Sequence, residues 1–462
     1  MLDVQNKRIH IIGLGAKGTG RACAQVLGGL GAQITISDTK SPTVLAEEIA
    51  SLNELPVLLQ LGAEAYQDIE NADMIVPSPG VPLAIEPIVR AKQAGIPVYS
   101  EIELAYRLAK APLVAITGTK GKTTTTTIIG LLLAALGKRT YVGGNIGVPL
   151  IELAMKATAE DMLVAEVSSF QLEAVEQFHP HVAVFTNLYP DHLDRYNDSM
   201  DEYMAAKLNI FARQAAEDFA IVNVDRPEHE RVIAATQARI IPVSMERVVP
   251  GGVYLRAGEI ISEIGGAPHV LLQVAAIRLR GAHNVGNIMQ ALAAVEVLGL
   301  PVADVAADTL CNFRGVPNRL EEVATVNGVA FYNDSQGTTP MAVHMALQAF
   351  AATPPVLIAG GRAKIKDFRE LGADIAAGTH AVILIGEAAT DIAAAIHQAA
   401  PTFPIHYADS LPAAVHQAYQ LALPAGVVLL SPGCASFDMF KNMEHRGEVF
   451  RAAVGEIDDI TA

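Results

Sequence analysis

The sequence predicts an α/β protein of three domains, each built on a mainly parallel β-sheet. The chain has 462 residues, more than one hydrophobic core usually serves. Apolar, strand-like runs alternate with helical patterns along the chain, and glycine-rich turns follow two of these runs. We expect a Rossmann-like domain at residues 1–106, a P-loop ATPase-type parallel sheet at 107–315, and a second Rossmann-like domain at 316–462.

Composition excludes several classes of protein. Hydrophobic residues make up 51% of the chain and charged residues 18%, which is typical of a soluble enzyme. The net charge of −16 argues against nucleic acid as a partner. Three widely spaced cysteines indicate a reducing compartment. Because no signal peptide or membrane-spanning run is apparent, we expect a cytoplasmic protein, and a monomer.

The N-terminal segment RIHIIGLGAKGTGRACAQVLGGLGAQITISD alternates strand, glycine turn, helix and strand. Gly13, Gly15 and Gly18 form a GxGxxG turn, and Asp38 ends the second strand. This pattern predicts a diphosphate at the start of the helix and an acid directed at a ribose or base. Since GxGxxG alone is a weak signal, an NAD-dependent oxidoreductase is an alternative.

A second loop is predicted at the same edge of that sheet. The buried run DMIVP is followed by Ser78, Pro79 and Gly80. Ligands of open parallel sheets collect at the carboxyl ends of the strands. An ordinary turn would use the same residue types, so the loop by itself leaves both interpretations open.

The central domain begins with a strand at residues 113–116, and the loop at 118–123 reads GTKGKT. Two residues separate Gly118 from Gly121, where the common P-loop has four, so this is a short form. Backbone N–H groups and the helix dipole favour a polyphosphate at such a turn. Lys122 is then expected to reach the outer phosphates, and the Thr123 hydroxyl to hold Mg²⁺.

Two further strands of the central domain are expected to end in polar residues near this loop. A glycine-rich loop carries Asn145, and the strand at residues 163–167 places Glu166 near its carboxyl end, with Ser168 beyond. A carboxylate there would face the P-loop across the edge of the sheet. It would be a suitable ligand for Mg²⁺.

The strand at residues 182–186 leads into a loop that carries Asp191, His192 and Asp194. A surface His–Asp pair is usually only solvated, but beside a P-loop and a strand-end glutamate we expect it to belong to the site. Lys207 lies beside the apolar side of the next helix. Composition alone favours a surface lysine with a buried stem.

A small hairpin insertion is predicted at residues 244–280, which are rich in glycine and β-forming residues. A helix then opens at Asn284 and Asn287. Amides at positions i and i+3 share one face of a helix and are suited to hydrogen-bond an adenine edge. They are equally suited to cap the helix.

The third domain alternates helices with five strands, predicted at residues 330–333, 356–359, 381–385, 404–408 and 427–430. Polar residues follow several of these strands, including Asp334, Ser335 and Lys364. A P-loop pattern is absent from this part of the sequence. The domain is therefore expected to supply a substrate site or a closing lid, with Arg319 at its start directed at the transferred phosphate.

Together these motifs resemble those of the Mur ligase family. The matching segments are GTKGKT, EVSSFQLE, NLYPDHLDRY, AAKL and GAHNVGN in the central domain, and NRLE, NDSQGTTP and LLSPGCASFDMFKNMEHRG in the third. The resemblance implies an ATP-dependent amide ligase that adds D-glutamate to UDP-N-acetylmuramoyl-L-alanine through an acyl phosphate, in peptidoglycan precursor synthesis. It further implies two Mg²⁺ sites and a carbamylated Lys207.

The resemblance also implies a role for individual residues, with Lys122, His192 and Lys207 in catalysis. The implied metal ligands are Thr123, Glu166, His192 and carbamylated Lys207. ATP is expected on Gly118, Thr119, Lys120, Gly121, Lys122, Thr123, Thr124, Asn284, Asn287, Arg319 and Asp334. The UDP-substrate is expected on Leu14, Gly15, Ala16, Lys17, Asp38, Thr39, Lys40, Ser78, Pro79, Gly80, Asn145, Ser168 and Gln171. Glutamate is expected on Thr338, Lys364 and Ser436.

Two positions depart from the pattern of the D-glutamate-adding ligases. Gln336 stands where these enzymes usually have lysine, and Met443 where an aromatic residue is usual. Both lie by the implied amino-acid pocket, so L-glutamate or another amino acid is the alternative acceptor. A folylpolyglutamate synthase-type ligase and a nucleotide-gated binding protein are further alternatives, but the first resembles only the later two domains.

Overall fold

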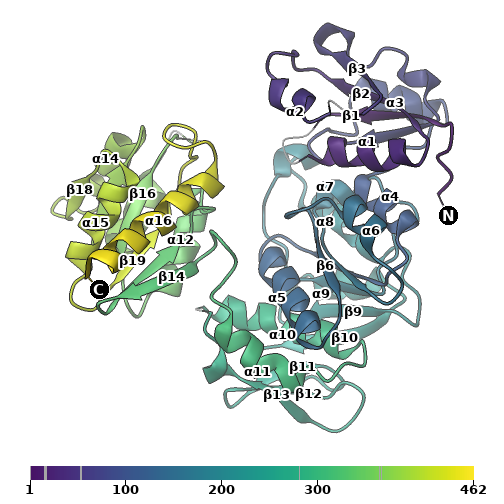
Figure 1. The fold of residues 1–462 in the computed structure, drawn as a ribbon. Coiled ribbons are helices and arrows are strands. Elements are labelled where there is room, and N and C mark those ends of the chain that lie inside the picture. Colours follow the sequence, from purple (N-terminus) through teal and green to yellow (C-terminus); the bar gives the residue numbers. More distant parts are fainter. Residues whose placement is uncertain are drawn as a thin grey trace. The chain divides into compact units, whose positions relative to one another are not determined.

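A computed structural model describes residues 2–14, 18–52, 55–279, 281–363, 365 and 367–461. The chain forms two compact units, one of residues 1–276 with 286–310 and the other of residues 277–285 with 311–462. Figure 1 shows the elements of both units in the colours of the sequence. Three separate sheets are present, and the strands of each fall inside one of the three predicted domains. The exact domain boundaries remain a prediction.

The first sheet is four-stranded and parallel, in the order β3-β2-β1-β4. Its strands are β1 (Arg8–Ile12), β2 (Gln33–Asp38), β3 (Val57–Leu61) and β4 (Met74–Pro77), and its longer helices are α1 (Thr19–Gly29) and α3 (Glu86–Gln93). The predicted strand–turn–helix–strand pattern is therefore confirmed. Helix α1 comes so close to the turn that a Cβ on Gly20 would lie 2.5 Å from the Gly13 carbonyl oxygen.

The second sheet has nine strands in the order β13-β12-β11-β10-β9-β8-β5-β7-β6. They are β5 (Leu113–Thr117), β6 (Thr140–Gly144), β7 (Met162–Glu166), β8 (Val182–Phe185), β9 (Phe219–Asn223), β10 (Arg239–Ser244), β11 (Val253–Arg256), β12 (Glu259–Ser262) and β13 (His269–Gln273). The last three are joined as antiparallel hairpins, which confirms the predicted insertion. They extend the main sheet, because β11 pairs in parallel with β10.

Strand β5 lies between β7 and β8, and all five of its residues are buried. A strand covered on both faces needs a continuous apolar run, which is what its sequence supplies. The register pairs Ile116 with Glu166 and Thr117 with Phe185. The loops after these three strands therefore emerge together at the carboxyl edge of the sheet.

The helices that accompany this sheet include those predicted after the P-loop, around Lys207 and at Asn284. They are α4 (Glu101–Leu108), α5 (Lys122–Ala135), α6 (Leu150–Lys156), α7 (Ser169–Leu172), α8 (Met200–Leu208), α9 (His229–Ala234), α10 (Ala282–Glu296) and α11 (Ala303–Asn312). Helix α5 buries Ile128, Ile129 and Leu132 against the core.

The third sheet is six-stranded, in the order β14-β15-β19-β16-β17-β18. Five parallel strands, β15 (Val329–Asn333), β16 (Val356–Gly360), β17 (Ala381–Ile385), β18 (Ile405–Tyr407) and β19 (Val427–Leu430), confirm the predicted ones within a residue or two. Strand β14 (Glu321–Val326) is an antiparallel edge strand that the sequence reading missed. Helices α15 (Leu411–Ala422) and α16 (Met443–Thr461) pack on one face of the sheet. Helices α12 (Pro340–Ala349), α13 (Arg369–Gly378) and α14 (Ala389–Ala399) pack on the other.

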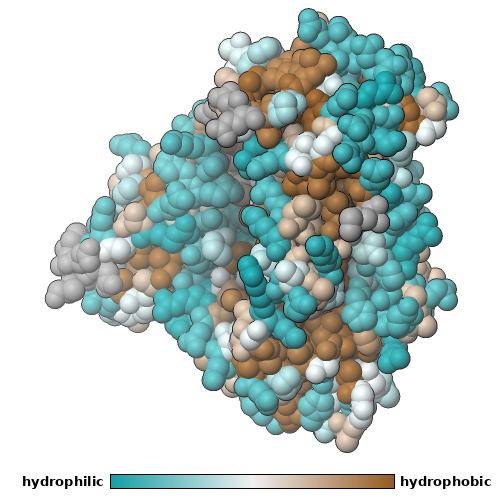
Figure 2. Space-filling view, turned by 45° about the vertical axis from the view of Figure 1, so that its right-hand side comes forward, coloured by the Kyte–Doolittle hydropathy of each residue, from teal (hydrophilic) through white to brown (hydrophobic). Residues whose placement is uncertain are grey.

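The apolar runs of the sequence are accounted for by these cores. Among the described residues, no helix is both long and apolar enough to cross a membrane. On the face drawn in Figure 2, hydrophobic residues occur in separate areas with polar residues between them.

Candidate functional site

A cavity of about 800 Å³ lies in the first unit, at the carboxyl ends of its strands. It is lined by loops of both the N-terminal sheet and the central sheet. Predicted site residues make up much of its wall: Asp38, Thr39, Lys40, Ser78, Pro79, Gly80, Thr119, Lys122, Asn145, Ser168, Gln171, His192 and Lys207. The fold therefore brings into one cavity residues that are up to 169 positions apart in the sequence.

The P-loop has the backbone conformation that its glycines allow. Gly118 has φ of +135°, and a Cβ there would lie 2.0 Å from the Thr186 hydroxyl oxygen. Gly121 has φ of +81° and precedes the first turn of α5; a Cβ there would lie 2.3 Å from the Asn287 amide oxygen. These two positions therefore accept only glycine without rearrangement. The predicted neighbour of the nucleotide, Asn287, lies beside the loop.

Lys122 is held across its own loop, because its Nζ donates to the carbonyl oxygens of Gly118 (3.0 Å) and Thr119 (2.9 Å). The next residue, Thr123, donates its hydroxyl to Glu166 Oε2 at 2.6 Å. The other carboxylate oxygen of Glu166 accepts from the Asn145 amide at 2.7 Å. A hydroxyl and a buried carboxylate at this spacing are ligands that suit Mg²⁺.

Lys207 on α8 is the most unusual group of the site. Its side chain is only 1% exposed, and its Nζ donates to the Gly118 carbonyl oxygen at 2.7 Å. The amine also lies 4.5 Å from the centroid of the Tyr203 ring. Burial, followed by repulsion from Lys122, lowers the pKa of the Lys207 amine well below its usual value. Its predicted position beside the apolar side of the helix is confirmed, but it is not a surface lysine.

The loop after β8 lies against the P-loop. Asn187 Oδ1 accepts from the Lys120 backbone N–H at 2.9 Å, and Asp191 pairs with the Lys120 amine at 3.3 Å. His192 has φ of +53° and lies 5.0 Å, ring to ring, from Phe170. Its side chain is 55% exposed and lines the cavity. The fold therefore places Asp191 and His192 at the wall of the cavity, and their part in the site remains a prediction.

The N-terminal sheet contributes two loops. Asp38 accepts from the backbone N–H groups of Leu14 (3.2 Å) and Lys40 (3.0 Å), so its carboxylate organises the turns on both sides of it. Ser78 donates to the Gly13 carbonyl oxygen at 2.6 Å, which joins the second loop to the glycine turn. The predicted residues Gly15, Ala16 and Lys17 lie outside the described part of the chain.

Ser168 and Gln171 form a capping box at the start of α7. The Gln171 backbone N–H donates to the Ser168 hydroxyl, and the Gln171 side-chain oxygen accepts from the Ser168 backbone N–H at 3.0 Å. This pairing orients both side chains at the cavity wall. Their predicted contact with the muramoyl part of the substrate remains a prediction.

The second unit holds the remaining predicted residues. Asp334 accepts from the Ser431 hydroxyl at 2.7 Å and from the Leu320 backbone N–H, yet burial raises the pKa of its carboxyl to about 7. Ser436 and Asn284 are buried, whereas Arg319 and Thr338 are half-buried. Lys364 lies outside the described residues. The roles predicted for this group remain predictions.

Sequence reasoning missed several residues of the cavity wall. Leu45, Tyr66, Phe170 and Tyr203 line the cavity, and none of them was predicted as a site residue. The Tyr203 hydroxyl lies 3.2 Å from the Thr119 hydroxyl, and burial raises its pKa to about 12. The one signal in the sequence was its hydroxyl group: Tyr203 lies four residues before Lys207, one helical turn away on the same helix.

The candidate metal ligands are not a conventional cluster. Among the described side chains, no group of three or more His, Cys, Asp and Glu residues is arranged to hold a metal ion. The candidates are instead a hydroxyl (Thr123), one carboxylate (Glu166), one imidazole (His192) and a lysine. Such a set fits Mg²⁺ only with further oxygen atoms from a nucleotide or from modification of the lysine.

Comparison with known proteins identifies the family. Residues 7–100 match the Mur ligase MurD-like N-terminal domain, residues 116–295 the Mur ligase middle domain, and residues 318–434 the Mur ligase glutamate ligase domain. The chain belongs to the Mur ligase family. The predicted resemblance is therefore confirmed, as is the α/β fold with three parallel-sheet domains.

Relatives and solved structures extend along the whole chain. A UDP-N-acetylmuramoylalanine–D-glutamate ligase of Geotalea uraniireducens is 43% identical over 458 residues, 99% of both chains. One of Pelotomaculum thermopropionicum is 41% identical over 98% of both chains. A UDP-N-acetylmuramate–alanine ligase structure from Thermotoga maritima has a TM-score of 0.59 at 19% identity, covering 98% of this chain and 100% of that one. A folylpolyglutamate synthase structure from Mycobacterium tuberculosis covers 76% of this chain, with a TM-score of 0.54 at 17% identity.

Proposed function

We propose that this Mur ligase adds D-glutamate to UDP-N-acetylmuramoyl-L-alanine in an ATP-dependent step of peptidoglycan synthesis. The observation that carries the proposal is the single cavity that joins the glycine turn of the N-terminal sheet to the P-loop of the central sheet. A substrate with a UDP group at one end and a reactive carboxylate at the other needs both the glycine turn and the P-loop in one cavity. The relatives named for this reaction match this chain from end to end.

In this reaction ATP phosphorylates the substrate carboxylate, and the glutamate amine then attacks the acyl phosphate, with release of ADP and phosphate. The enzyme has to position the reactants and neutralise charge on the phosphoryl group. Lys122 would exchange its two carbonyl partners in the loop for the γ-phosphate. Backbone N–H groups of residues 118–124 would hold the phosphates at the N-terminus of α5.

Thr123 and Glu166 would hold Mg²⁺, which would supply further neutralisation of the phosphate charge. Asn145 would orient the Glu166 carboxylate, since its amide donates to the second oxygen at 2.7 Å. Thr123 and Glu166 are suitable ligands for Mg²⁺ as they stand, without covalent modification of either residue. A second Mg²⁺ would involve His192 and Lys207.

Carbamylation of Lys207 would make the second site suitable for a cation. Addition of CO₂ requires a neutral amine, and burial together with Lys122 favours that form by lowering the amine pKa. The product is an anionic carboxylate, which supplies the oxygen ligands that a lysine lacks. The carbamate would also pair favourably with Lys122.

The remaining contacts with the substrates would be divided among the three predicted domains. Residues 1–106 would bind the UDP moiety through Leu14–Lys17, Asp38–Lys40 and Ser78–Gly80, while Asn145, Ser168 and Gln171 would hold the muramoyl part. Asn284 and Asn287 would meet the adenine of ATP, with Arg319 and Asp334 on its phosphate and ribose. Residues 316–462 would bind glutamate through Thr338, Lys364 and Ser436.

Two residues by the implied amino-acid pocket, Gln336 and Met443, depart from the family pattern, so they bear on which amino acid is added. Gln336 and Met443 are on segments joined by Ser335, whose hydroxyl donates to the Met443 carbonyl oxygen at 2.8 Å. The backbone of both segments is thus held independently of the two exchanged side chains. The relatives favour D-glutamate, and L-glutamate is the alternative.

Phosphate release tests the proposal. Purified protein is incubated with ATP, Mg²⁺ and UDP-N-acetylmuramoyl-L-alanine, and D-glutamate or L-glutamate is added in parallel. We expect release with D-glutamate. Release with L-glutamate alone would identify Gln336 and Met443 as the first candidates for altered specificity, and release with neither would contradict the proposal.

A further inference from the structure

Arg195 lies at the junction of three loops of the cavity and has no part in the reaction described so far. It belongs to the 3₁₀ helix Leu193–Tyr196, directly after the loop that carries His192. Its guanidinium forms two parallel hydrogen bonds with the Glu173 carboxylate, Nε to Oε1 at 3.0 Å and Nη2 to Oε2 at 2.7 Å. Both side chains are largely buried, at 12% and 15% exposure. Such a planar fork fixes orientation as well as charge.

The carboxylate of Glu173 is itself fixed. The Tyr196 hydroxyl donates to Glu173 Oε1 at 2.7 Å, and Tyr196 is only 5% exposed. The three side chains thus form a closed network between α7 and the 3₁₀ helix. Its geometry does not depend on contacts with solvent.

The same guanidinium also reaches the N-terminal domain. Nη2 donates to the Val81 carbonyl oxygen at 3.0 Å, 114 residues away in sequence. Val81 closes the predicted uridine-nucleotide loop, since its backbone N–H donates to the Ser78 carbonyl oxygen at 2.9 Å. Ser78 is bonded in turn to the Gly13 carbonyl oxygen of the glycine turn. Arg195 therefore holds both of these loops against the central domain.

On its other side, Arg195 contacts the reacting part of the cavity. The guanidinium carbon lies 4.5 Å from the centroid of the Phe170 ring, a cation–π contact. The Phe170 ring lies 5.0 Å from the His192 ring. Phe170 is also the neighbour of Gln171, one of the two residues of the capping box. One arginine thus contacts the loop at the UDP end and the residues at the carboxylate end.

We propose that Arg195 is a positioning residue that fixes the spacing between the two ends of the cavity, so that one substrate occupies both at once. This inference rests on the proposed function. A substrate that spans two sites gains from its second contact only when the sites are held at the right distance. If that distance is relaxed, either end still binds its own part of the substrate, but the spanning molecule loses affinity and reacts more slowly.

Substitution of Arg195 by lysine tests this directly. Lysine keeps the charge but lacks the fork, so it does not serve Glu173 and Val81 together. Calorimetry would compare the dissociation constants of UDP and of UDP-N-acetylmuramoyl-L-alanine, and turnover would give kcat and the KM for ATP. Loss of charge-assisted hydrogen bonds predicts about tenfold weaker binding of the full substrate and a lower kcat, with UDP and the ATP KM within about twofold of wild type.

Arg231→Lys is the matched control. Arg231 pairs with Asp201 at 2.6 Å, but both side chains are exposed, at 50% and 81%. This control is expected to change neither affinity. If Arg195→Lys does not fold, Glu173→Gln is used instead and is expected to give the same difference between UDP and the full substrate.

Equal weakening of UDP and of the full substrate would overturn the inference, because Arg195 would then only maintain the N-terminal loop. Unchanged binding of both would also overturn it. Failure of the wild-type protein to use D-glutamate would instead contradict the proposed function. The two failures are distinguishable, because the comparison of dissociation constants does not require turnover.

Discussion

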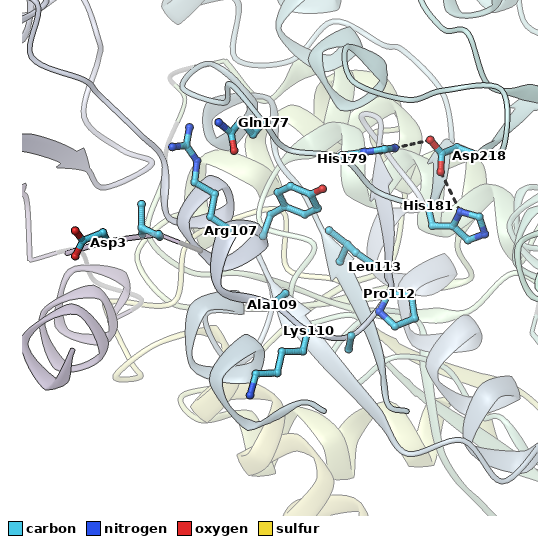
Figure 3. A pocket seen from close by; sticks show the side chains of 13 residues that line it. Asp3, Arg107, Ala109, Lys110, Pro112, Leu113, Gln177, His179, His181 and Asp218 are labelled. Carbon is cyan, nitrogen blue, oxygen red and sulfur yellow. Dashed lines mark hydrogen bonds and ion pairs between the residues drawn. The ribbon is translucent and has the colours of Figure 1, made fainter. Parts of the chain in front are cut away.

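The central sheet has a cavity at each end of its strands, and the two cavities differ in how their charged side chains are paired. The one at the carboxyl ends, of about 800 Å³, is the candidate active site. The other, of about 880 Å³, lies at the amino ends of β5, β8 and β9 (Figure 3). It also contains ionisable side chains, including Arg107, Lys110, His179, His181 and Asp218.

In the cavity at the amino ends, Asp218 is paired with His179 and His181, and Arg107 is paired with two glutamates. Asp218 is only 4% exposed and bonds His179 at 2.5 Å and His181 at 2.9 Å, the two contacts drawn as dashed lines in Figure 3. Arg107 lies apart from them and bonds Glu103 (2.6 Å) and Glu176 (2.7 Å). These contacts join segments of the fold, which explains the charges without a ligand.

In the cavity at the carboxyl ends, two lysines converge on carbonyl oxygens of the P-loop. Lys122 and Lys207 both donate to the Gly118 carbonyl oxygen, at 3.0 and 2.7 Å. Like charges placed together under burial destabilise the protein unless a ligand compensates them. Charged groups that are paired within the fold indicate structure, whereas two amines that share one carbonyl oxygen indicate a site that an anionic ligand would complete.

The largest effect is expected for Lys122→Ala. Removal of the cation that would meet the γ-phosphate is expected to lower kcat by a factor of about 10³ or more, as for other charge-stabilising groups. UDP-substrate binding should stay near wild type, because the glycine turn and Ser78 loop are untouched. Phosphate-release assays and calorimetry measure the two quantities. Wild-type turnover would refute the assignment of the P-loop.

Lys207→Ala is expected to lower kcat nearly as much as Lys122→Ala, for a different reason. The variant loses the buried amine that would be carbamylated, and with it the oxygen ligands of the second Mg²⁺. Acetate or another small carboxylic acid should restore part of the turnover, since it supplies a carboxylate in the space left by the side chain. Lys207→Met, which fills that space, is the control and should not be rescued.

The contrast between the two cavities also shows what the sequence allows one to predict. Residues 118–123, Glu166 and Asp191 were predictable, because a motif at a strand end fixes the sheet edge on which it lies. Strand β14 was not, since its half-buried sequence carries weak alternation and its pairing with β15 is a tertiary contact. The burial of Lys207 could not be predicted either, because helical periodicity placed the residue only beside the apolar side of its helix. Arg195 and Tyr66 depend on contacts more than 25 residues away, which no local pattern encodes.

A moderate effect, on stability alone, is expected for Asp218→Asn in the other cavity. The variant loses the charge that holds His179 and His181, and hydrogen bonds to a charged group are typically worth about 1.5–3 kcal/mol each. The melting temperature should fall while kcat and the KM values for ATP, UDP-N-acetylmuramoyl-L-alanine and D-glutamate stay within about twofold of wild type. Circular dichroism and phosphate release measure these quantities. A change in kcat would show that this cavity takes part in the reaction.

The smallest effect is the pH dependence of that stability difference. The hydrogen bonds from the Ala215 backbone, His179 and His181 outweigh desolvation and hold the pKa of the Asp218 carboxyl below its usual value. A lowered pKa in the folded state means that the stabilisation is present above the unfolded value, about 3.9, and is lost as the pH falls through the lower folded value. The difference in melting temperature between wild type and Asp218→Asn should therefore shrink as the pH falls below about 4. A difference that grew as the pH fell below about 4 would show that Asp218 is not stabilised as the anion.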